Sequence, residues 1–185
     1  MSASISRAFR AGALGALVAA GMAAAPLGAA QAQQQVASRV DAKDAWSIFT
    51  ADVDGKVCWI VSEPTTSTAR KGGKVVQVRR GDIYLMVSVR PGQGVKNEIS
   101  MVAGYPFKPG SEVKATIGSQ TYEMFTKGEN AWLDDPSIDD RMVVAMKKGI
   151  TAKLVGVSSR GTQTEDTFSL RGFTAAITLA QDLCK

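Results

Sequence analysis

The sequence predicts a mainly β fold, an antiparallel β-sandwich or barrel-like domain with one short internal helix and a C-terminal helix. Apolar residues alternate with polar ones in several short segments, as at Ile83, Leu85 and Val87, which is typical of half-buried strands. These segments recur at regular spacing and are separated by Gly, Pro, Asp and Ser residues that favour turns. Residues 136–148 and 173–183 have helical spacing instead.

The first 32 residues are predicted to form a cleavable secretory signal peptide. Arg7 and Arg10 precede an uncharged apolar run over residues 11–25. Residues 30–32, Ala-Gln-Ala, provide the small side chains that signal peptidase requires, so we predict cleavage after Ala32. The run is shorter than the about 20 apolar residues that span a bilayer, and we therefore expect no integral membrane segment after cleavage.

Cleavage leaves residues 33–185, a length that normally forms one domain with its own core. Residues 33–43 are polar and lack periodicity, so we expect a disordered lead-in before a single domain over residues 44–185. The whole chain carries a net charge of +5, and +3 remains without Arg7 and Arg10. The basic residues are spread along the chain rather than clustered, which argues against a nucleic-acid-binding protein.

The first predicted strands form a hairpin over residues 45–51 and 56–62. The Asp54-Gly55 pair between them favours the left-handed backbone of a tight turn. The Thr, Ser and Gly residues of segment 64–73 predict a loop. Further strands are predicted over residues 74–78, 82–89, 98–103, 112–117, 121–126, 150–157 and 167–171.

The two predicted helices are recognised by their ends and by an apolar face. Asp135 can cap the first helix, and Pro136 suits its first turn. Lys147 and Lys148 lie near the negative pole of its dipole, where cations are favourable. In the second helix, apolar residues at helical spacing place Cys184 on the face that points toward the sheet.

The two cysteines, Cys58 and Cys184, allow a single pairing in an exported chain. Cys58 lies in a predicted strand and Cys184 on the inward face of the last helix, an arrangement that suits a disulfide between helix and sheet. Two separate buried thiols are the alternative, but a free thiol is a liability in an oxidising compartment. We therefore expect the disulfide.

The sequence contains no histidine, which removes histidine-based catalytic triads and histidine-ligated zinc sites. Ser111 and Lys114 match a Ser-x-x-Lys spacing, but the Lys-Thr-Gly and Ser-Asp-Asn motifs that accompany it in enzymes are absent. The aspartates of segments 52–54 and 134–140 are explained by a turn and by helix capping. We therefore predict a non-enzymatic protein without a metal ion or another cofactor.

The triplet Arg80-Gly81-Asp82 matches an integrin-recognition sequence, which requires a protruding loop. In this chain it lies between two predicted strands, where Gly81 would supply a turn and Asp82 would open the next strand. A triplet this short also arises often by chance, so we favour the turn interpretation.

Short motifs in a fixed order run through nearly the whole chain after the signal peptide. They are Trp46, Cys58, Arg80-Gly81-Asp82-Ile83, Ala103-Gly104-Tyr105-Pro106-Phe107, Ala131-Trp132-Leu133, Ser158-Ser159-Arg160-Gly161-Thr162, the segment Asp166–Phe173, and Cys184. Together they resemble the invasion-associated locus B family. The resemblance implies an exported alphaproteobacterial protein with an envelope or secreted role linked to virulence, and it assigns no reaction and no catalytic residues.

The leading hypothesis is a non-enzymatic exported protein of the periplasm or cell surface. It would act by contacts with an envelope component or with an unidentified protein of a host cell surface. The alternative hypothesis is a periplasmic envelope-homeostasis protein or protein inhibitor, and a hydrolase that works without histidine is a third.

Two predicted loops offer candidate contact residues. Loop 104–110 places Tyr105 and Phe107 between turn-forming residues. Loop 158–164 surrounds Arg160 with hydroxyl groups. The planar guanidinium of an arginine presents several donors in a fork that suits a carboxylate or a phosphate.

A structural role is the alternative for all three residues. Tyr105 and Phe107 would then fold back over the core, and Arg160 would pair with Asp166 or Glu165 inside the protein. If they are contact residues instead, replacing them should change stability by less than about 1 kcal/mol, the usual scale for surface substitutions.

Overall fold

The computed structural model describes residues 37–185, and every structural statement below refers to this range. It contains twelve β-strands, two α-helices and one short 3-10 helix, η1 (Pro91–Gln93). The predicted signal peptide, residues 1–32, lies outside the described residues. None of the described helices is long and apolar enough to cross a membrane.

The strands form one antiparallel sheet. They are β1 (Ser38–Lys43), β2 (Trp46–Asp52), β3 (Lys56–Ser62), β4 (Pro64–Lys71), β5 (Lys74–Val75), β6 (Tyr84–Arg90), β7 (Val95–Val102), β8 (Glu112–Ile117), β9 (Gln120–Lys127), β10 (Asn130–Trp132), β11 (Thr151–Val157) and β12 (Gln163–Ser169). Their order in the sheet is β1-β2-β3-β6-β7-β10-β9-β8-β11-β12-β4-β5. The predicted mainly β, antiparallel fold is confirmed, and the sheet does not close into a barrel.

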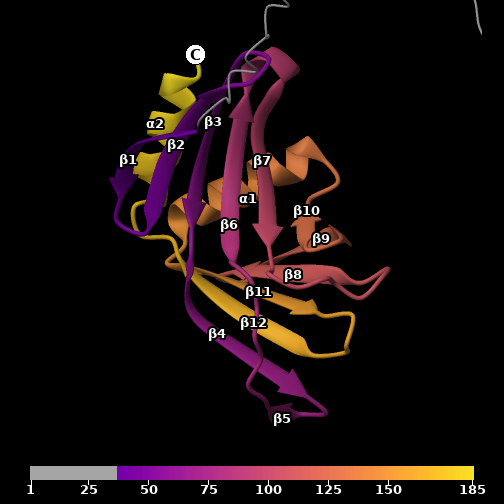
Figure 1. Cartoon of the computed structure of the whole chain (residues 1–185). Coiled ribbons are helices and arrows are strands. Elements are labelled where there is room, and N and C mark those ends of the chain that lie inside the picture. The colour runs from indigo at the N-terminus through magenta and orange to yellow at the C-terminus, as the bar shows by residue number, and fades with distance from the viewer. Residues whose placement is uncertain (1–36) are drawn as a thin grey trace, which may run out of the picture. The chain divides into compact units, whose positions relative to one another are not determined.

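The two halves of this sheet run in different directions (Figure 1), and Glu63 connects them in the chain. That single residue joins β3 to β4, although β3 lies third in the sheet and β4 eleventh. In Figure 1, β2, β3, β6 and β7 run along the upper part of the sheet, and β8, β11 and β12 run across below them. The apolar faces of both halves contribute to a common core, as in orthogonally packed sheets.

The core lies between the inner faces of the sheet and the helices. Trp46 on β2 is fully buried, and its indole Nε1 donates a hydrogen bond to the Ser169 carbonyl at 3.0 Å. Its ring meets the Phe173 ring edge-on, with 5.0 Å between centroids. One large aromatic side chain with its polar atom satisfied therefore connects the start of the sheet to the start of the last helix.

The predicted first hairpin is confirmed. Strands β2 and β3 pair antiparallel, and the turn between them contains Asp54 and Gly55 with φ angles of 51° and 105°. These angles lie in the left-handed region that an Asp-Gly pair tolerates, which is why the turn could be predicted from two residues.

Helix α1 (Pro136–Lys148) begins where the sequence predicts. The Asp135 carboxylate accepts a hydrogen bond from the Ser137 N–H at 2.7 Å, which satisfies one of the free donors of the first turn. Met142 and Met146 on the inward face are buried, and the helix packs on β7.

Helix α2 (Phe173–Leu183) packs on β2 and β3 with its apolar face. Cys184, directly after the helix, is bonded to Cys58 on β3, with 6.0 Å between the two Cα atoms. The predicted disulfide is therefore present, and no cysteine of residues 37–185 is free. It joins positions 126 residues apart in the chain.

Two segments without apolar periodicity form strands at or near the sheet edges, contrary to the sequence prediction. Residues 38–43, expected to be disordered, form β1 and pair with β2. Residues 64–71, expected to be a loop, form β4 and pair with β12. Only Ala69 of β4 is buried. Outer strands are held by backbone hydrogen bonds, so polar side chains can occupy both of their faces.

The remaining differences concern short strands and strand ends. β5 is limited to two residues, whereas the sequence favours a strand over residues 74–78. β12 begins at Gln163 rather than at Thr167. β10 comprises three residues, too few for periodicity to indicate a strand.

Candidate functional site

Three connecting segments meet beside β11 and β12, although they are far apart in the sequence. The Gly81 N–H donates a hydrogen bond to the Gly104 carbonyl at 2.9 Å. The Ser159 N–H donates one to the Pro106 carbonyl, also at 2.9 Å. The segments that these bonds join are residues 76–83 before β6, residues 103–111 between β7 and β8, and residues 158–162 between β11 and β12.

Arg80 is the buried centre of this region. Its Nη1 and Nη2 donate hydrogen bonds to Oδ1 and Oδ2 of Asp166, each at 2.7 Å. Its Nε and Nη2 also donate to the Ala103 carbonyl. The side chains of Arg80 and Asp166 are 8% and 0% exposed, and Ser67 Oγ donates a further bond to the carboxylate. The two charges neutralise each other, and this bidentate geometry fixes the segment before β6 against β12.

Tyr105 forms a wall of the site next to Arg80. The Arg80 Cζ atom lies 4.9 Å from the centroid of the Tyr105 ring, a cation–π contact. The Tyr105 hydroxyl and Thr164 Oγ1 are hydrogen-bonded at 2.6 Å. Burial raises the pKa of the Tyr105 hydroxyl above its ordinary value, because the phenolate would lose its solvation. Tyr105 is therefore a neutral hydrogen-bonding group.

Phe107 belongs to the core rather than to the surface. Its side chain is 5% exposed, and its ring meets the Tyr105 ring edge-on at 5.2 Å between centroids. Gly156 on β11 makes room for it, because a Cβ atom at that position would lie 2.7 Å from Phe107 Cε1. The ring folds back over the core, as in the structural alternative, so the prediction of Phe107 as a contact residue is not supported by its burial.

The turn between β11 and β12 presents Arg160 to solvent. Ser158 holds the base of this turn, because its N–H donates to the Thr162 carbonyl at 2.8 Å and its Oγ accepts from the Thr162 N–H at 3.1 Å. Arg160 lies at the tip and is exposed. A side chain on a turn that is held by backbone bonds can face a partner with little loss of backbone entropy.

Arg160 forms no ion pair within residues 37–185. Of its two expected partners, Asp166 is occupied by Arg80. The other, Glu165, lies 3.7 Å from Lys153 Nζ. The internal pairing of the structural alternative is therefore not made within residues 37–185, and the guanidinium is available to another molecule.

A cavity of about 290 Å³ lies where the three segments meet. Tyr105 and Arg160, predicted in separate loops, both line it. Arg79 also lines the cavity. It was not predicted as a contact residue, although two consecutive arginines, Arg79 and Arg80, could have indicated an anion-binding segment. The complete lining comprises Val78, Arg79, Arg80, Gly104, Tyr105, Pro106, Glu129, Ser158, Ser159, Arg160, Thr162 and Thr164.

The extent of the family match decides the classification. Residues 46–181 match the sequence model of the Invasion associated locus B (IalB) protein family. The chain belongs to this family. The matched segment contains the whole lining of the cavity, and the resemblance predicted from the motifs is confirmed. Searches of curated proteins and of solved structures find no match.

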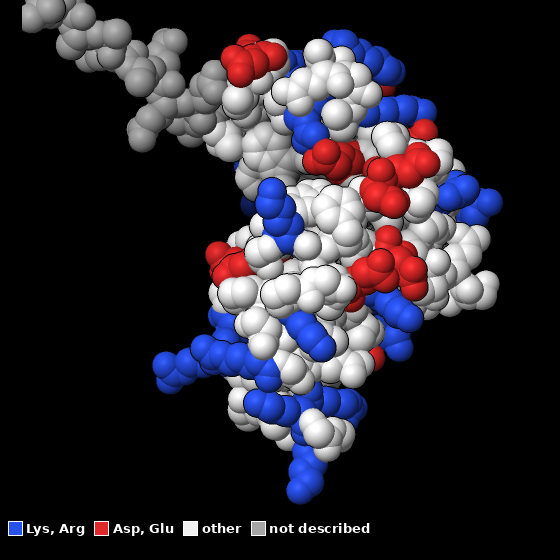
Figure 2. Space-filling model, turned by 90° about the vertical axis from the view of Figure 1, so that its right-hand side faces the viewer, with Lys and Arg blue, Asp and Glu red and all other residues white. Residues whose placement is uncertain are grey.

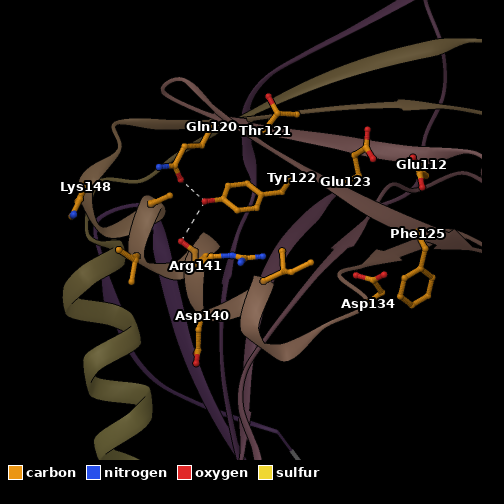
Figure 3. A pocket seen from close by; sticks show the side chains of 13 residues that line it. Glu112, Gln120, Thr121, Tyr122, Glu123, Phe125, Asp134, Asp140, Arg141 and Lys148 are labelled. Carbon is orange, nitrogen blue, oxygen red and sulfur yellow. Dashed lines mark hydrogen bonds between the residues drawn. The ribbon is translucent and has the colours of Figure 1, made fainter.

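Membership makes this IalB protein one of the invasion-associated type. It also has a broader groove of about 1080 Å³ between α1 and the β8–β9 hairpin, which Figure 3 shows from close by. The Tyr122 hydroxyl lies within hydrogen-bond distance of two acceptors, the Gln120 side-chain oxygen and the Arg141 carbonyl oxygen at 3.3 Å, and its single proton can be donated to either one. The charged side chains that line it have both signs: Glu112, Glu123, Asp134, Asp140, Arg141 and Lys148.

The acidic charges of this groove are partly compensated by lysines of the IalB protein itself. Lys114 Nζ lies 3.8 Å from the Glu123 carboxylate, and Lys96 Nζ lies 3.9 Å from the Asp140 carboxylate. Arg160 at the cavity has no such partner among the residues that the structure describes. The cavity around Tyr105 and Arg160 is therefore the stronger candidate for a binding site.

Proposed function

We propose that this protein is exported and non-enzymatic, and that it acts by binding an envelope component or a protein of a host cell surface. The observation that carries the proposal is the cavity that Tyr105 and Arg160 both line, at which Arg160 lacks an ion-pair partner within residues 37–185. An unpaired arginine on a well-held turn is suited to contact with another molecule.

Export is supported by two independent features. Residues 1–32 combine a basic start, an apolar run and small residues at the expected cleavage position. The disulfide between Cys58 and Cys184 persists best in an oxidising compartment. Both features suit the periplasm, the cell surface or the medium.

Binding rather than catalysis is supported by the chemistry of the cavity. The Asp166 carboxylate is engaged by Arg80, and the raised pKa of Tyr105 keeps its proton in place. Arginine stays protonated, so Arg160 can attract an anion but cannot accept a proton. Glu129, the acidic lining residue, is exposed and has no hydrogen bond to a hydroxyl among the described residues. An activated nucleophile would need such a base beside it.

Cell fractionation tests export. We expect a mature protein that begins near Gln33 and that is found outside the cytoplasm. Retention of the apolar run in a cytoplasmic protein, detected by N-terminal sequencing, would overturn the proposal. Labelling of intact cells with a membrane-impermeant lysine reagent then separates a surface protein from the alternative, a periplasmic envelope-homeostasis protein or inhibitor, which is labelled only after the outer membrane is opened.

Isolated envelopes and host-cell surfaces test the contact site. Arg160→Ala should reduce the retention of purified protein on them. Arg70→Ala is the matched control, because Arg70 is an exposed arginine of β4 that does not line the cavity. Equal retention of the parent and of Arg160→Ala would remove the cavity as the contact site.

A further inference from the structure

We infer that the cavity beside Arg160 binds a phosphomonoester group carried by a small organic body, with Arg79 and Arg160 as its charged contacts. This inference rests on the proposed binding function and adds the chemical class of the ligand. It is carried by the charge balance, the supporting contacts and the size of the cavity.

The charge around the cavity has an excess of positive groups. Three arginines line it, Arg79, Arg80 and Arg160, whereas Glu129 is the acidic lining residue. Asp166 cancels the charge of Arg80 through two hydrogen bonds of 2.7 Å. Arg79 and Arg160 are exposed, and neither has a carboxylate within ion-pair distance in residues 37–185. Two guanidinium groups without an ion-pair partner therefore share the lining with one carboxylate, and this excess of positive charge favours an anionic ligand.

The number of free guanidinium groups favours a phosphate over a carboxylate. A carboxylate has two oxygens, and a single arginine satisfies both, as Arg80 does for Asp166. A phosphomonoester carries a charge near −2 at neutral pH and three terminal oxygens. Three terminal oxygens can accept more hydrogen bonds than one arginine donates. The guanidinium groups of Arg79 and Arg160 and the hydroxyl of Ser159, which also lines the cavity, supply these additional donors.

The surrounding hydrogen bonds fix the backbone that carries Arg79 and Arg160 and leave both guanidinium groups available for a ligand. Arg80 is a positioning residue, because its bonds to Asp166 and to the Ala103 carbonyl fix the backbone next to Arg79. The Ser158 bonds fix the turn that carries Arg160. The site therefore needs only side-chain ordering when an anion binds, which keeps the entropic cost low.

The cavity is larger than a phosphate ion requires. Its volume of about 290 Å³ corresponds to roughly ten water molecules at about 30 Å³ each. A bare phosphate would leave most of this space to water, so the ligand carries a further group. The Tyr105 ring and Pro106 form a largely apolar wall against which a sugar or another small organic body can lie.

Basic residues outside the cavity would steer an anion toward it. Lys71 and Lys74 lie in the exposed β4–β5 hairpin, and β4 pairs with β12, which begins directly after the turn that carries Arg160. Figure 2 shows basic side chains gathered at the lower end of the molecule, where β4 and β5 lie in Figure 1. A patch of one sign raises the encounter rate of oppositely charged ligands.

Calorimetric titration of the purified, disulfide-bonded protein tests the inference, with glucose 6-phosphate as the probe and glucose as the uncharged control. We expect one site for glucose 6-phosphate and no binding of glucose. Arg79→Gln and Arg160→Gln should each weaken the affinity at least tenfold. Glu129→Gln should strengthen it several-fold, because a repulsive charge is removed. An unchanged or weaker affinity of Glu129→Gln would place the anion elsewhere and overturn the inference.

Arg70→Gln is the matched control, because it removes the same charge. Ala69 faces the interior, so its neighbour Arg70 points to the opposite face of the sheet. It should change the affinity less than twofold, and a loss equal to that of Arg160→Gln would mean unspecific electrostatics and overturn the inference. Thermal unfolding near that of the parent verifies that each variant is folded.

Vesicles distinguish a lipid source of the phosphomonoester from a soluble one. Co-sedimentation with phosphatidylcholine vesicles that contain phosphatidic acid, released by glucose 6-phosphate, would support a lipid headgroup. Binding of glucose 6-phosphate alone would support a soluble ligand, and binding of neither probe overturns the inference. If envelope retention depends on Arg160 but no phosphomonoester binds, the ligand class is wrong and the proposed function stands. If a phosphomonoester binds but the protein is never exported, the ligand class stands and the proposed function is wrong.

Discussion

Arg80 and Asp166 form a buried ion pair that connects the segment before β6 to the inner face of β12. Both hydrogen bonds between them measure 2.7 Å. Arg80 belongs to the Arg80-Gly81-Asp82 triplet, so the guanidinium that an integrin would need is enclosed by the protein. The Gly81 N–H is bonded to the Gly104 carbonyl. The triplet therefore has a structural role in this protein.

Arg80→Ala should lower the free energy of unfolding by about 3–5 kcal/mol, because it leaves the Asp166 carboxylate buried without a counter-charge. Arg80→Met combined with Asp166→Leu should cost less than Arg80→Ala alone, since apolar groups then replace both charges. Urea denaturation with the disulfide intact measures both effects. A loss below about 1 kcal/mol for Arg80→Ala, typical of exposed pairs, would contradict the buried ion pair.

Phe107 and Arg160 should respond oppositely to truncation. Phe107→Ala should cost about 3–5 kcal/mol, because it empties a buried position beside Gly156. Arg160→Ala should change stability by less than about 0.5 kcal/mol, because its side chain is exposed and forms no ion pair with another described residue. Thermal unfolding of the two variants and of the parent protein measures both losses of stability. Similar losses for both would show that Arg160 is as structural as Phe107.

Gly104 and Gly110 offer a matched pair of substitutions, since their φ angles are 68° and 71°. Gly110→Ala meets no atom within 4 Å and should cost only the about 1–2 kcal/mol of a left-handed alanine. At Gly104 a Cβ atom would lie 2.5 Å from the Gly81 carbonyl oxygen. Gly104→Ala should therefore add about 1–3 kcal/mol of overpacking. Equal melting temperatures of the two variants would refute the close contact.

Asp139 in the first turn of α1 is a buried acid. It is 5% exposed, and its Oδ1 accepts a hydrogen bond from the Ile99 N–H at 2.8 Å. Burial is the largest cause that raises the pKa of its carboxyl to about 6, and the Ile99 hydrogen bond opposes the shift. The negative charges of the nearby carboxylates Glu98, Asp140 and Asp135 also raise the pKa of Asp139.

Stability should consequently fall as the pH rises through 6. The folded-state pKa of Asp139 lies above the ordinary value of 3.8, so the folded protein binds the proton more tightly than the unfolded chain. The stabilisation from this group is complete below about pH 4, and up to about 3 kcal/mol of it is lost above the folded-state pKa.

Asp139→Asn should remove this loss, because the amide has no charge to desolvate. It should be more stable than the parent at about pH 7.5 and nearly equal to it at about pH 4. Urea midpoints at both pH values measure the difference. Asp134→Asn, which changes an exposed acid near the same helix, is the control. Parallel pH profiles of the parent and Asp139→Asn would contradict the prediction.

The disulfide should be formed in the exported protein. Mass spectrometry under non-reducing conditions should find Cys58 linked to Cys184 and no thiol that reacts with an alkylating reagent. Replacing both cysteines by alanine should cost about 2–5 kcal/mol, largely because the unfolded chain gains freedom. Two alkylated thiols in the exported protein would disprove the pairing.

The local features of the fold could be predicted from short stretches of sequence. The Asp54-Gly55 turn, the Asp135 cap and the inward face that ends in Cys184 each follow from residues that are neighbours in the chain. Their physical basis is the conformational preference and spacing of a few residues, which does not depend on distant contacts. Family membership was likewise readable from short motifs in their order.

The outer strands and the candidate site, in contrast, depend on contacts between residues that are far apart in the chain. β1 and β4 lack apolar periodicity and exist because β2 and β12 supply backbone partners. Asp166 lies close to Arg160 in the sequence, yet packing pairs it with Arg80, and Arg160 has no ion-pair partner within residues 37–185. Phe107 is buried in the core, whereas Tyr105, two residues before it, lines the cavity. The energy of an ion pair or of a buried ring depends on which distant surfaces meet, and no local pattern encodes that meeting.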